Sequence, residues 1–261
     1  MITRAARAAL FCGQNQTMQP IAILSALAQE QHGLIELLQN LNQVTHAGRN
    51  FWLGDLHGQR VVLALSKIGK VAAATTATTL IERFGVQRMV FIGVAGGLKN
   101  GVNVGDVVVA HDFMQHDLDV SPLFARYEVP LYGKTRFDCD AALTTALFEA
   151  SRSALADPKL RGAYAQAHRG LIASGDRFVS GGAESRQLRD TLLAAGHEVL
   201  AVEMEGAAVA QVCHDYRLPF AAVRIISDRA DDTAHVDFPS FIDQVVSKYA
   251  PVIVERLLKS L

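Results

Sequence analysis

Short apolar runs recur along the chain, and each one stops at a glycine or at polar residues. Runs of this kind predict strands that are buried inside a sheet. Two of them flank His57-Gly58, at residues 51–56 and 60–66, and this spacing predicts a β-hairpin. The other buried strands are expected at residues 20–24, 88–92, 106–110, 169–173, 199–202 and 220–226.

Segments with helical periodicity lie between these runs. An alanine- and threonine-rich stretch predicts a helix over residues 70–84. Leucines at helical spacing predict another over residues 29–41, namely Leu34, Leu37, Leu38 and Leu41. Further helices are expected at residues 140–155, 184–194, 205–215 and 238–259. Proline, glycine and aromatic residues over 122–137 are typical of a long loop.

This alternation of strands and helices predicts an α/β fold. We expect a single three-layer domain, in which helices flank a central, mostly parallel mixed β-sheet. No internal repeat and no linker divides residues 18–261, so we expect them to form one domain.

Residues 1–17 differ from the rest of the chain. They contain Arg4 and Arg7, no acidic residue, and a short alanine-rich stretch. This composition fits an organelle-targeting peptide, but we favour residues upstream of a functional start at Met18. In both cases we expect a poorly ordered extension.

Composition excludes several classes of function. Half of the residues are hydrophobic, which suffices for one sizeable core. The formal net charge of −1 provides no basic excess for nucleic acid, and no apolar run is long enough to span a membrane. Three scattered cysteines, Cys12, Cys139 and Cys213, fit a reducing cytoplasm rather than a disulfide framework. Because CxxC and HExxH motifs are absent, we expect neither a metal nor a cofactor.

Two of the predicted strands end at acidic residues. The strand at 199–202 runs into Glu203 and Glu205, and the strand at 220–226 runs into Ser227 and Asp228. Carboxylates are rarely buried without a partner, and ligands bind at the carboxyl ends of parallel strands. These strand ends therefore predict a site that could bind hydrogen-bond donors, such as sugar hydroxyls or ring N–H groups, or a metal.

The individual acids allow more than one interpretation. Glu203 and Glu205 point the same way if the strand continues through them, and diverge if a helix begins at Met204. A carboxylate matches the vicinal diol of a ribose, although Glu205 could also be a first-turn helix residue. Asp228, if partly desolvated, could donate a proton, or it could simply cap a turn.

Arg224 lies inside an apolar strand, where a guanidinium needs a carboxylate partner. A structural ion pair and a ligand contact are equally compatible with that position. Glu30, just after the first strand, could activate a water as a general base, although such a residue more often only complements a helix dipole.

A glycine-rich segment, residues 93–97, follows one of the buried strands. It could let the backbone around Val94, Ala95 and Gly96 approach a ligand, or it could be only a tight turn from strand to loop. It is neither a P-loop nor a dinucleotide fingerprint, because the required lysine and glycine spacings are absent.

Five motifs in this order resemble the methylthioadenosine/S-adenosylhomocysteine nucleosidases of the purine nucleoside phosphorylase superfamily. The resemblance extends from Pro20 to the C-terminus. It implies a nucleoside phosphorylase-like fold and hydrolysis of a 5′-substituted adenine nucleoside. The motifs are Gly-Val-Ala-Gly-Gly (93–97), Val-Gly-Asp-Val-Val-Val (104–109), Gly-Leu-Ile-Ala-Ser-Gly-Asp-Arg-Phe (170–178), Val-Glu-Met-Glu-Gly (202–206) and Arg-Ile-Ile-Ser-Asp (224–228).

The resemblance also implies roles for single residues. Asp228 matches the general acid at purine N7, oriented by Ser227, and Glu30 matches the acid that positions the attacking water. Glu205 matches the acid that binds the ribose hydroxyls, with Met204 beside the sugar. The remaining matches are Phe178, which would stack on adenine, the backbone of Val179, which would read the base edge, and Ile68 and Phe238, which would line the 5′-alkylthio group.

Two features of the chain depart from the family pattern. Val94 stands where family members commonly have serine, and the loop 121–132 has an unfamiliar aromatic pattern. The family is typically dimeric, and residues 122–137 match the loop that completes the partner's pocket. The alternatives are a phosphorylase of the same fold, disfavoured because the matching segments lack arginine, and a non-catalytic nucleoside-binding module.

Overall fold

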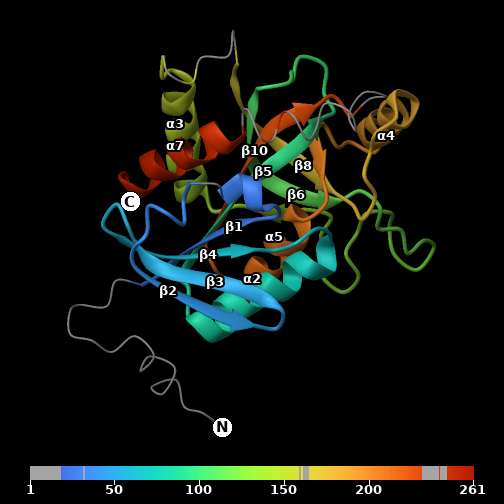
Figure 1. The fold of residues 1–261 in the computed structure, drawn as a ribbon. Coiled ribbons are helices and arrows are strands. Elements are labelled where there is room, and N and C mark those ends of the chain that lie inside the picture. The colour runs from blue at the N-terminus through green and yellow to red at the C-terminus, as the bar shows by residue number, and fades with distance from the viewer. Residues whose placement is uncertain (1–18, 32, 159, 161–164, 231–240, 242–245) are drawn as a thin grey trace.

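The computed structural model describes residues 19–31, 33–158, 160, 165–230, 241 and 246–261. The predictions for residues 1–17 and for Phe238 lie outside these ranges. A ten-stranded mixed sheet forms the centre of the molecule, and helices cover both of its faces (Figure 1). This arrangement confirms the predicted α/β class.

The sheet order is β10-β6-β8-β9-β5-β1-β4-β3-β2, with β7 added beside β6. Hydrogen bonds also join β10 to β5, so β5, β10, β6, β8 and β9 close into a ring. The strands are β1 (Ile21–Ser25), β2 (Gln39–His46), β3 (Arg49–Leu56), β4 (Gln59–Leu65), β5 (Arg88–Gly97), β6 (Val107–Gln115), β7 (Phe137–Asp138), β8 (Ala167–Ser174), β9 (Val199–Glu203) and β10 (Phe220–Asp228).

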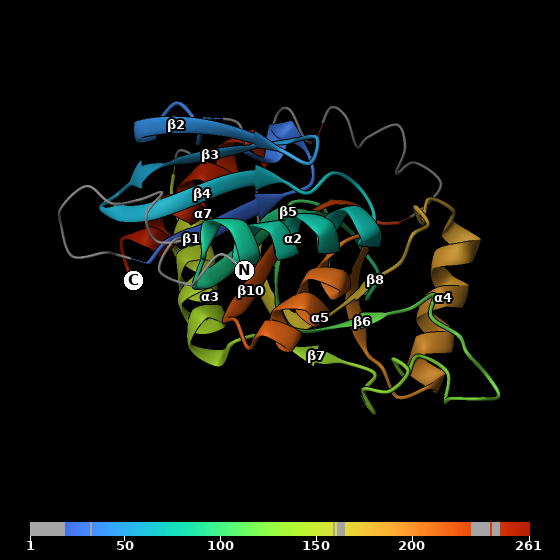
Figure 2. The same cartoon turned by 90° about the horizontal axis from the view of Figure 1, so that it is seen from below.

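Four helices pack as two pairs on opposite faces of the sheet, α2 with α5 and α3 with α7 (Figure 2). On β10, Ala222 and Ile226 belong to the core under α2 and α5, whereas Val223 and Ile225 belong to the core under α3 and α7. This alternation is the two-residue period of a strand buried on both faces. The helices are η2 (Ala28–Gln31), α2 (Lys70–Phe84), α3 (Ala141–Leu155), α4 (Gly182–Ala194), α5 (Gly206–Tyr216) and α7 (Ser247–Leu258).

Local sequence explains several element boundaries. The Asp140 carboxylate caps α3 by accepting a hydrogen bond from Leu143 N at 2.8 Å. The helix α2 ends at Gly85, whose φ of 66° is the left-handed conformation that glycine tolerates best. The predicted hairpin around His57-Gly58 is formed by β3 and β4. The helix predicted over residues 238–259 is found as α7 from Ser247, and residues 238–240 and 242–245 of that prediction lie outside the described ranges.

The prediction of a helix over residues 29–41 is wrong. Only the short 3-10 helix η2 forms, and Gly33, with φ 79°, precedes a turn that leads into β2. The leucines do not form one apolar face, because Leu34 is buried while Leu37 and Leu41 are 52% and 50% exposed. The helical spacing there was coincidental, and tertiary pairing with β3 places Leu41 in a strand.

The glycine segment 93–97 is not a turn from strand to loop, because β5 continues through it to Gly97. It stays extended because it has hydrogen-bonded neighbours on both sides. Gly93 and Val94 pair with β10, and Gly96 and Gly97 pair with β9. The segment is therefore part of a ring strand that is paired on both of its edges.

Candidate active site

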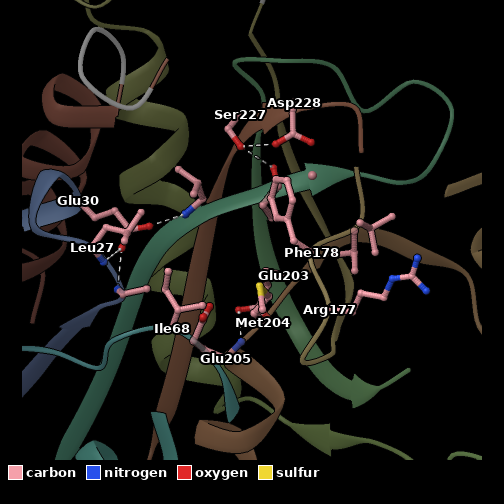
Figure 3. Close-up of a pocket in the computed structure, with 16 residues that line it drawn as sticks. Leu27, Glu30, Ile68, Arg177, Phe178, Glu203, Met204, Glu205, Ser227 and Asp228 are labelled. Atoms are coloured by element: carbon pink, nitrogen blue, oxygen red, sulfur yellow. Dashed lines mark hydrogen bonds between the residues drawn. The ribbon is translucent and has the colours of Figure 1, made fainter. Parts of the chain in front are cut away.

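A cavity of about 330 Å³ lies where the ring strands β5, β9 and β10 meet the turn after β1 (Figure 3). Figure 3 shows Glu30, Asp228 and Glu205 on three different sides of it. The lining residues are Ala26, Leu27, Glu30, Ile68, Val94, Ala95, Gly96, Arg177, Phe178, Val179, Val202, Glu203, Met204, Glu205, Ser227 and Asp228.

Glu30 reaches the cavity from η2, immediately after β1. Its Oε2 accepts hydrogen bonds from the backbone N–H groups of Ala26 and Leu27, at 2.7 and 2.9 Å. Its Oε1 accepts one from Val94 N at 3.1 Å, which connects η2 to β5. Burial raises the pKa of Glu30, although the three N–H donors and the Arg224 charge oppose the shift. A buried carboxylate with a raised pKa is a stronger base than an exposed one, so this group is suited to accept a proton.

Asp228 lies at the end of β10, on the opposite side of the cavity from Glu30 (Figure 3). Its Oδ2 accepts a hydrogen bond from Ser227 Oγ at 2.7 Å, and its Oδ1 accepts one from Ala230 N at 2.7 Å. The Ser227 hydroxyl is also 3.4 Å from the carbonyl oxygen of Ala95. Ser227 and the turn after β10 therefore fix the orientation of the Asp228 carboxyl group.

Glu203 and Glu205 diverge, because β9 ends at Glu203 and α5 begins at Gly206. Glu203 turns toward the protein, where Oε2 accepts hydrogen bonds from Arg224 Nη2 at 2.7 Å and Nε at 3.2 Å. Its Oε1 accepts a hydrogen bond from Ser174 Oγ. Glu203 therefore supports the site chiefly through these internal partners, although it also lines the cavity.

Arg224, a predicted substrate contact, does not line the cavity. Its side chain is 1% exposed, and its guanidinium lies over the Phe91 ring, 4.1 Å from the centroid. It also donates to the carbonyl oxygens of Phe91 and Val223. Of the two roles that the sequence allowed, the structure supports the structural ion pair with Glu203, because every described contact of Arg224 is internal.

Glu205 faces the cavity with a single described hydrogen bond, from Gly69 N to Oε1 at 2.9 Å. Burial raises its pKa to about 8, and the neighbouring charge of Glu203 adds to the shift. Arg224 neutralises Glu203 directly and Glu205 only at a distance. Glu205 is therefore the strand-end acid that remains available to a bound molecule.

Apolar side chains complete the walls. Phe178 is 43% exposed and Ile68 is 57% exposed, so both lie at the mouth, whereas Val179 is buried deeper. Met204 stands beside Glu205 (Figure 3). An aromatic ring and aliphatic groups on these walls fit a flat base and an apolar substituent.

The glycines of β5 allow the acids to approach the strand closely. A Cβ on Gly93 would lie 2.9 Å from Glu30 Oε1, and a Cβ on Gly96 would lie 2.9 Å from Asp228 Oδ1. Between them, Val94 and Ala95 line the cavity, and the half-buried Val94 also packs against the core under α3 and α7. The glycine spacing therefore makes room for the carboxyl groups of Glu30 and Asp228 beside the strand.

Four lining residues were not predicted: Ala26, Leu27, Arg177 and Val202. Applying the strand-end rule to β1 would have found Ala26 and Leu27, because β1 ends at Ser25. The exposed Arg177 pairs with Glu184 at 3.0 Å and points away from the cavity in Figure 3.

The described residues contain no group of three or more histidine, cysteine, aspartate or glutamate side chains that could hold a metal ion. Among the helices that the structure describes, none is both long and apolar enough to cross a bilayer.

Comparisons with known proteins agree with this geometry. The family model described as the phosphorylase superfamily matches residues 20–259. A 5′-methylthioadenosine/S-adenosylhomocysteine nucleosidase of Bacillus thuringiensis (strain Al Hakam) is 36% identical over 237 residues, covering 91% of this chain and 97% of the relative.

Solved structures of two kinds are similar to this chain. The nucleosidase of the same name from Neisseria meningitidis, in complex with methylthio-immucillin-A, has a TM-score of 0.84 at 36% identity, covering 93% of this chain and 100% of that one. The futalosine hydrolase of Helicobacter pylori strain 26695 has a TM-score of 0.81 at 31% identity, covering 94% and 99%.

Proposed function

The chain belongs to the 5′-methylthioadenosine/S-adenosylhomocysteine nucleosidase family of the phosphorylase superfamily, and we propose that it hydrolyses the N-glycosidic bond of 5′-substituted adenine nucleosides. The products are adenine and a 5-thioribose. The observation that carries this proposal is the placement of Glu30, Asp228 and Glu205 around one cavity with an aromatic wall. It makes the protein a hydrolase acting on N-glycosyl compounds.

Asp228 is the proposed general acid. Protonation of purine N7 turns adenine into a good leaving group and drives positive charge onto the ribosyl ring. The Ser227 hydroxyl and Ala230 N–H hold the carboxyl group in one orientation, so its proton can be directed at the base.

Glu30 is the proposed group that positions and deprotonates the attacking water. It lies across the cavity from Asp228, so the water and the leaving base approach the sugar from different sides. Its pKa is raised by burial, which makes the carboxylate a better base than an exposed glutamate.

The remaining walls bind the parts of the substrate that do not react. Glu205 accepts hydrogen bonds from the ribose hydroxyls, and Met204 packs against the sugar. Phe178 stacks on adenine while the Val179 backbone reads the base edge. Protonation of the leaving base and stabilisation of an oxocarbenium-like ribosyl centre let water attack, so neither a metal nor a covalent intermediate is needed.

Phosphorolysis is the main alternative, and it would require cationic groups for phosphate. Among the described residues that line the cavity the one arginine is Arg177, which pairs with Glu184, and the buried Arg224 behind Glu203 pairs with that carboxylate. Water is therefore the favoured nucleophile.

Adenine release by the purified protein tests this choice. With methylthioadenosine as substrate, we expect the same rate with and without inorganic phosphate, and free methylthioribose as the sugar product. A phosphate requirement with a sugar 1-phosphate product would establish the phosphorylase alternative. Tight nucleoside binding without any adenine release would establish the binding module.

The 5′ substituent is best identified with a panel of substrates. The apolar Leu27 and Ile68 in the lining favour an alkylthio group, which is present in both methylthioadenosine and adenosylhomocysteine. We expect higher kcat/KM for these two than for futalosine. The reverse order would place the chain with the futalosine hydrolases in activity.

We further propose a cytoplasmic homodimer. The loop that resembles the family's pocket-completing segment carries apolar side chains directed to solvent, with Leu123 80% exposed and Leu131 92% exposed. Sedimentation of the active enzyme should show two copies, and a fully active monomer would contradict this. The free cysteines Cys139 and Cys213 fit a reducing compartment.

A further inference from the structure

The sugar-facing and base-facing walls of the cavity come from segments far apart in sequence. Gly69 N binds Glu205 on the sugar wall, whereas Phe178 and Val179 form the base wall. The two walls must hold one rigid nucleoside between them. Something in the fold must therefore fix their separation.

Lys70 connects these walls. Its Nζ lies 2.6 Å from Asp117 Oδ1, after β6, and 3.7 Å from Asp176 Oδ2, just before the base wall. It also donates to Gln115 Oε1 at 3.1 Å, and Gln115 donates in turn to Gln211 of α5 at 3.0 Å. The side chains of Lys70 and Asp117 are 16% and 30% exposed, so their contact is partly shielded from water, whereas the Asp176 side chain is 52% exposed and its contact with Lys70 is more strongly screened.

Asp176 is fixed at both its backbone and its side chain. Its N–H donates to Asp117 Oδ2 at 2.8 Å, and its Oδ1 accepts from Lys70 N at 2.8 Å. Asp176 thereby caps α2, whose own N-cap residue, Gly69, provides no side chain.

The pKa of Asp117 agrees with close contacts among Lys70, Asp117 and Asp176. Burial would raise the pKa of Asp117, but the hydrogen bonds from Lys70 and from Asp176 N–H outweigh burial, and its pKa lies below the ordinary value. A charged Asp117 is the form that holds both partners.

We propose that Lys70, Asp117 and Asp176 form a clamp that sets the distance between the sugar wall and the base wall. Lys70 is thus a positioning residue, acting on the sugar through Gly69 and Glu205 and on the base through Asp176. The inference rests on the proposed function. It predicts that losing the clamp weakens ligands that span both walls more than ligands that touch only one.

Calorimetric binding of methylthio-immucillin-A and of adenine to the full-length protein tests this. Methylthio-immucillin-A serves as the nucleoside analogue that spans both walls, and adenine reaches only the base wall. For Lys70→Met we expect roughly 10–100-fold weaker binding of the analogue, because charge-assisted hydrogen bonds are lost. Adenine binding should stay nearly unchanged. Lys70→Arg, which keeps the charge, should recover part of the loss.

Asp176→Asn provides a second variant and a double-mutant cycle. If both residues belong to one clamp, Lys70→Met/Asp176→Asn should lose no more analogue affinity than the worse single variant. Additive losses would overturn the proposal, as would equal weakening of adenine and analogue. Should Lys70→Met not fold, the analogue-to-adenine ratio of Asp176→Asn decides the question alone.

Lys99→Met is the matched control. It breaks an ion pair with Glu198 of 2.9 Å, and neither residue lines the cavity. Its analogue-to-adenine ratio should equal that of the wild type. The control can change thermal stability without changing this ratio. If the Lys70 variants do the same, Lys70 only stabilises the fold and the proposal is wrong. Binding is measured without turnover, so failure of the clamp is distinguishable from failure of the proposed hydrolysis.

Discussion

The four buried carboxyl groups of the site differ mainly in their hydrogen-bond partners. Glu203 has a guanidinium, Glu30 has three backbone N–H groups, and Asp228 has a hydroxyl and one N–H. Glu205 has one described N–H donor and a raised pKa. The same functional group can thus serve as support, base, acid or diol ligand, depending on what surrounds it.

Replacing Asp228 by asparagine is expected to remove the general acid without disrupting the fold. The amide oxygen can still accept the Ala230 N–H, and the amide NH₂ can donate to Ser227 Oγ. Adenine release should fall by roughly two to four orders of magnitude, while the melting temperature changes little. Turnover close to that of the wild type would exclude Asp228 as the acid.

Glu30→Gln should abolish most turnover while retaining substrate binding. All three described hydrogen bonds to Glu30 come from N–H donors, so the new amide NH₂ must face at least one donor. We therefore also expect destabilisation of about 1–3 kcal/mol, and turnover must be measured per folded molecule.

Glu36→Gln, at an exposed position nearby, is the control for Glu30→Gln. It should change neither turnover nor stability. If Glu30→Gln instead loses binding and keeps the turnover of bound substrate, Glu30 binds the substrate and does not activate water.

At the scale of elements, β5 organises the site. It pairs with β10 and β9 on its two sides, and its glycines admit Glu30 and Asp228. The carboxyl groups of Glu30 and Asp228 therefore lie directly against the backbone of β5 at Gly93 and Gly96. A single methyl group at a β5 position that faces one of these acids, such as Gly93, should affect catalysis.

Gly93→Ala tests the role of β5. Its Cβ would lie 2.9 Å from Glu30 Oε1, so the carboxylate must move from its three N–H donors. We expect turnover per folded molecule to fall at least tenfold, since small displacements of a catalytic group are costly.

Gly97→Ala, on the same strand, is the matched control for Gly93→Ala. Its Cβ would meet Val102 O and Ile226 Cγ2 at 3.1 and 3.2 Å, away from the acids. It should lower the melting temperature and leave turnover per folded molecule intact. Equal turnover losses in both variants would mean that β5 is sensitive to any added methyl group.

At the scale of the whole molecule, Glu205 makes stability depend on pH. Its pKa rises from 4.5 when unfolded to about 8 when folded, so folding favours the protonated form. This contribution is fully present below pH 4.5 and is lost as pH rises through 8. Its size is a few kcal/mol at most, because each pKa unit corresponds to about 1.4 kcal/mol.

The measurement is denaturant unfolding of wild type and Glu205→Gln between pH 5 and pH 9. Relative to wild type, the variant should gain stability as pH rises, because glutamine carries no charge to bury. Glu198→Gln, at a side chain that is 63% exposed, is the control and should follow the wild type. A difference between wild type and Glu205→Gln that does not vary with pH would contradict the raised pKa.

Residues 1–17 are expected to be dispensable for catalysis. The superfamily match begins at residue 20, and the first described strand begins at Ile21. A chain starting at Met18 should show the same kcat/KM and melting temperature as the full chain. A clear loss of either would assign the extension a role in the folded enzyme.

The sequence by itself determined the α/β class, most strands, the bounds of α2 and the acidic strand ends at Glu203, Glu205 and Asp228. Apolar periodicity and turn residues act over a few positions, so they can be read without a fold. That locality also explains the failure at residues 29–41, where pairing with β3 overrode the leucine spacing.

Only the tertiary structure decided which acidic side chains are paired inside the protein and which stay available in the cavity. Both Glu203 and Glu205 line the cavity, and which of them stays available to a bound molecule is decided by Arg224, 21 residues after Glu203, which pairs with Glu203. Glu30 is held at the site by a hydrogen bond from Val94 N, which lies 64 residues further along the chain. The ring closed by β5 and β10 brings these groups together. Contacts of such sequence separation arise from sheet pairing and packing, which no local pattern encodes.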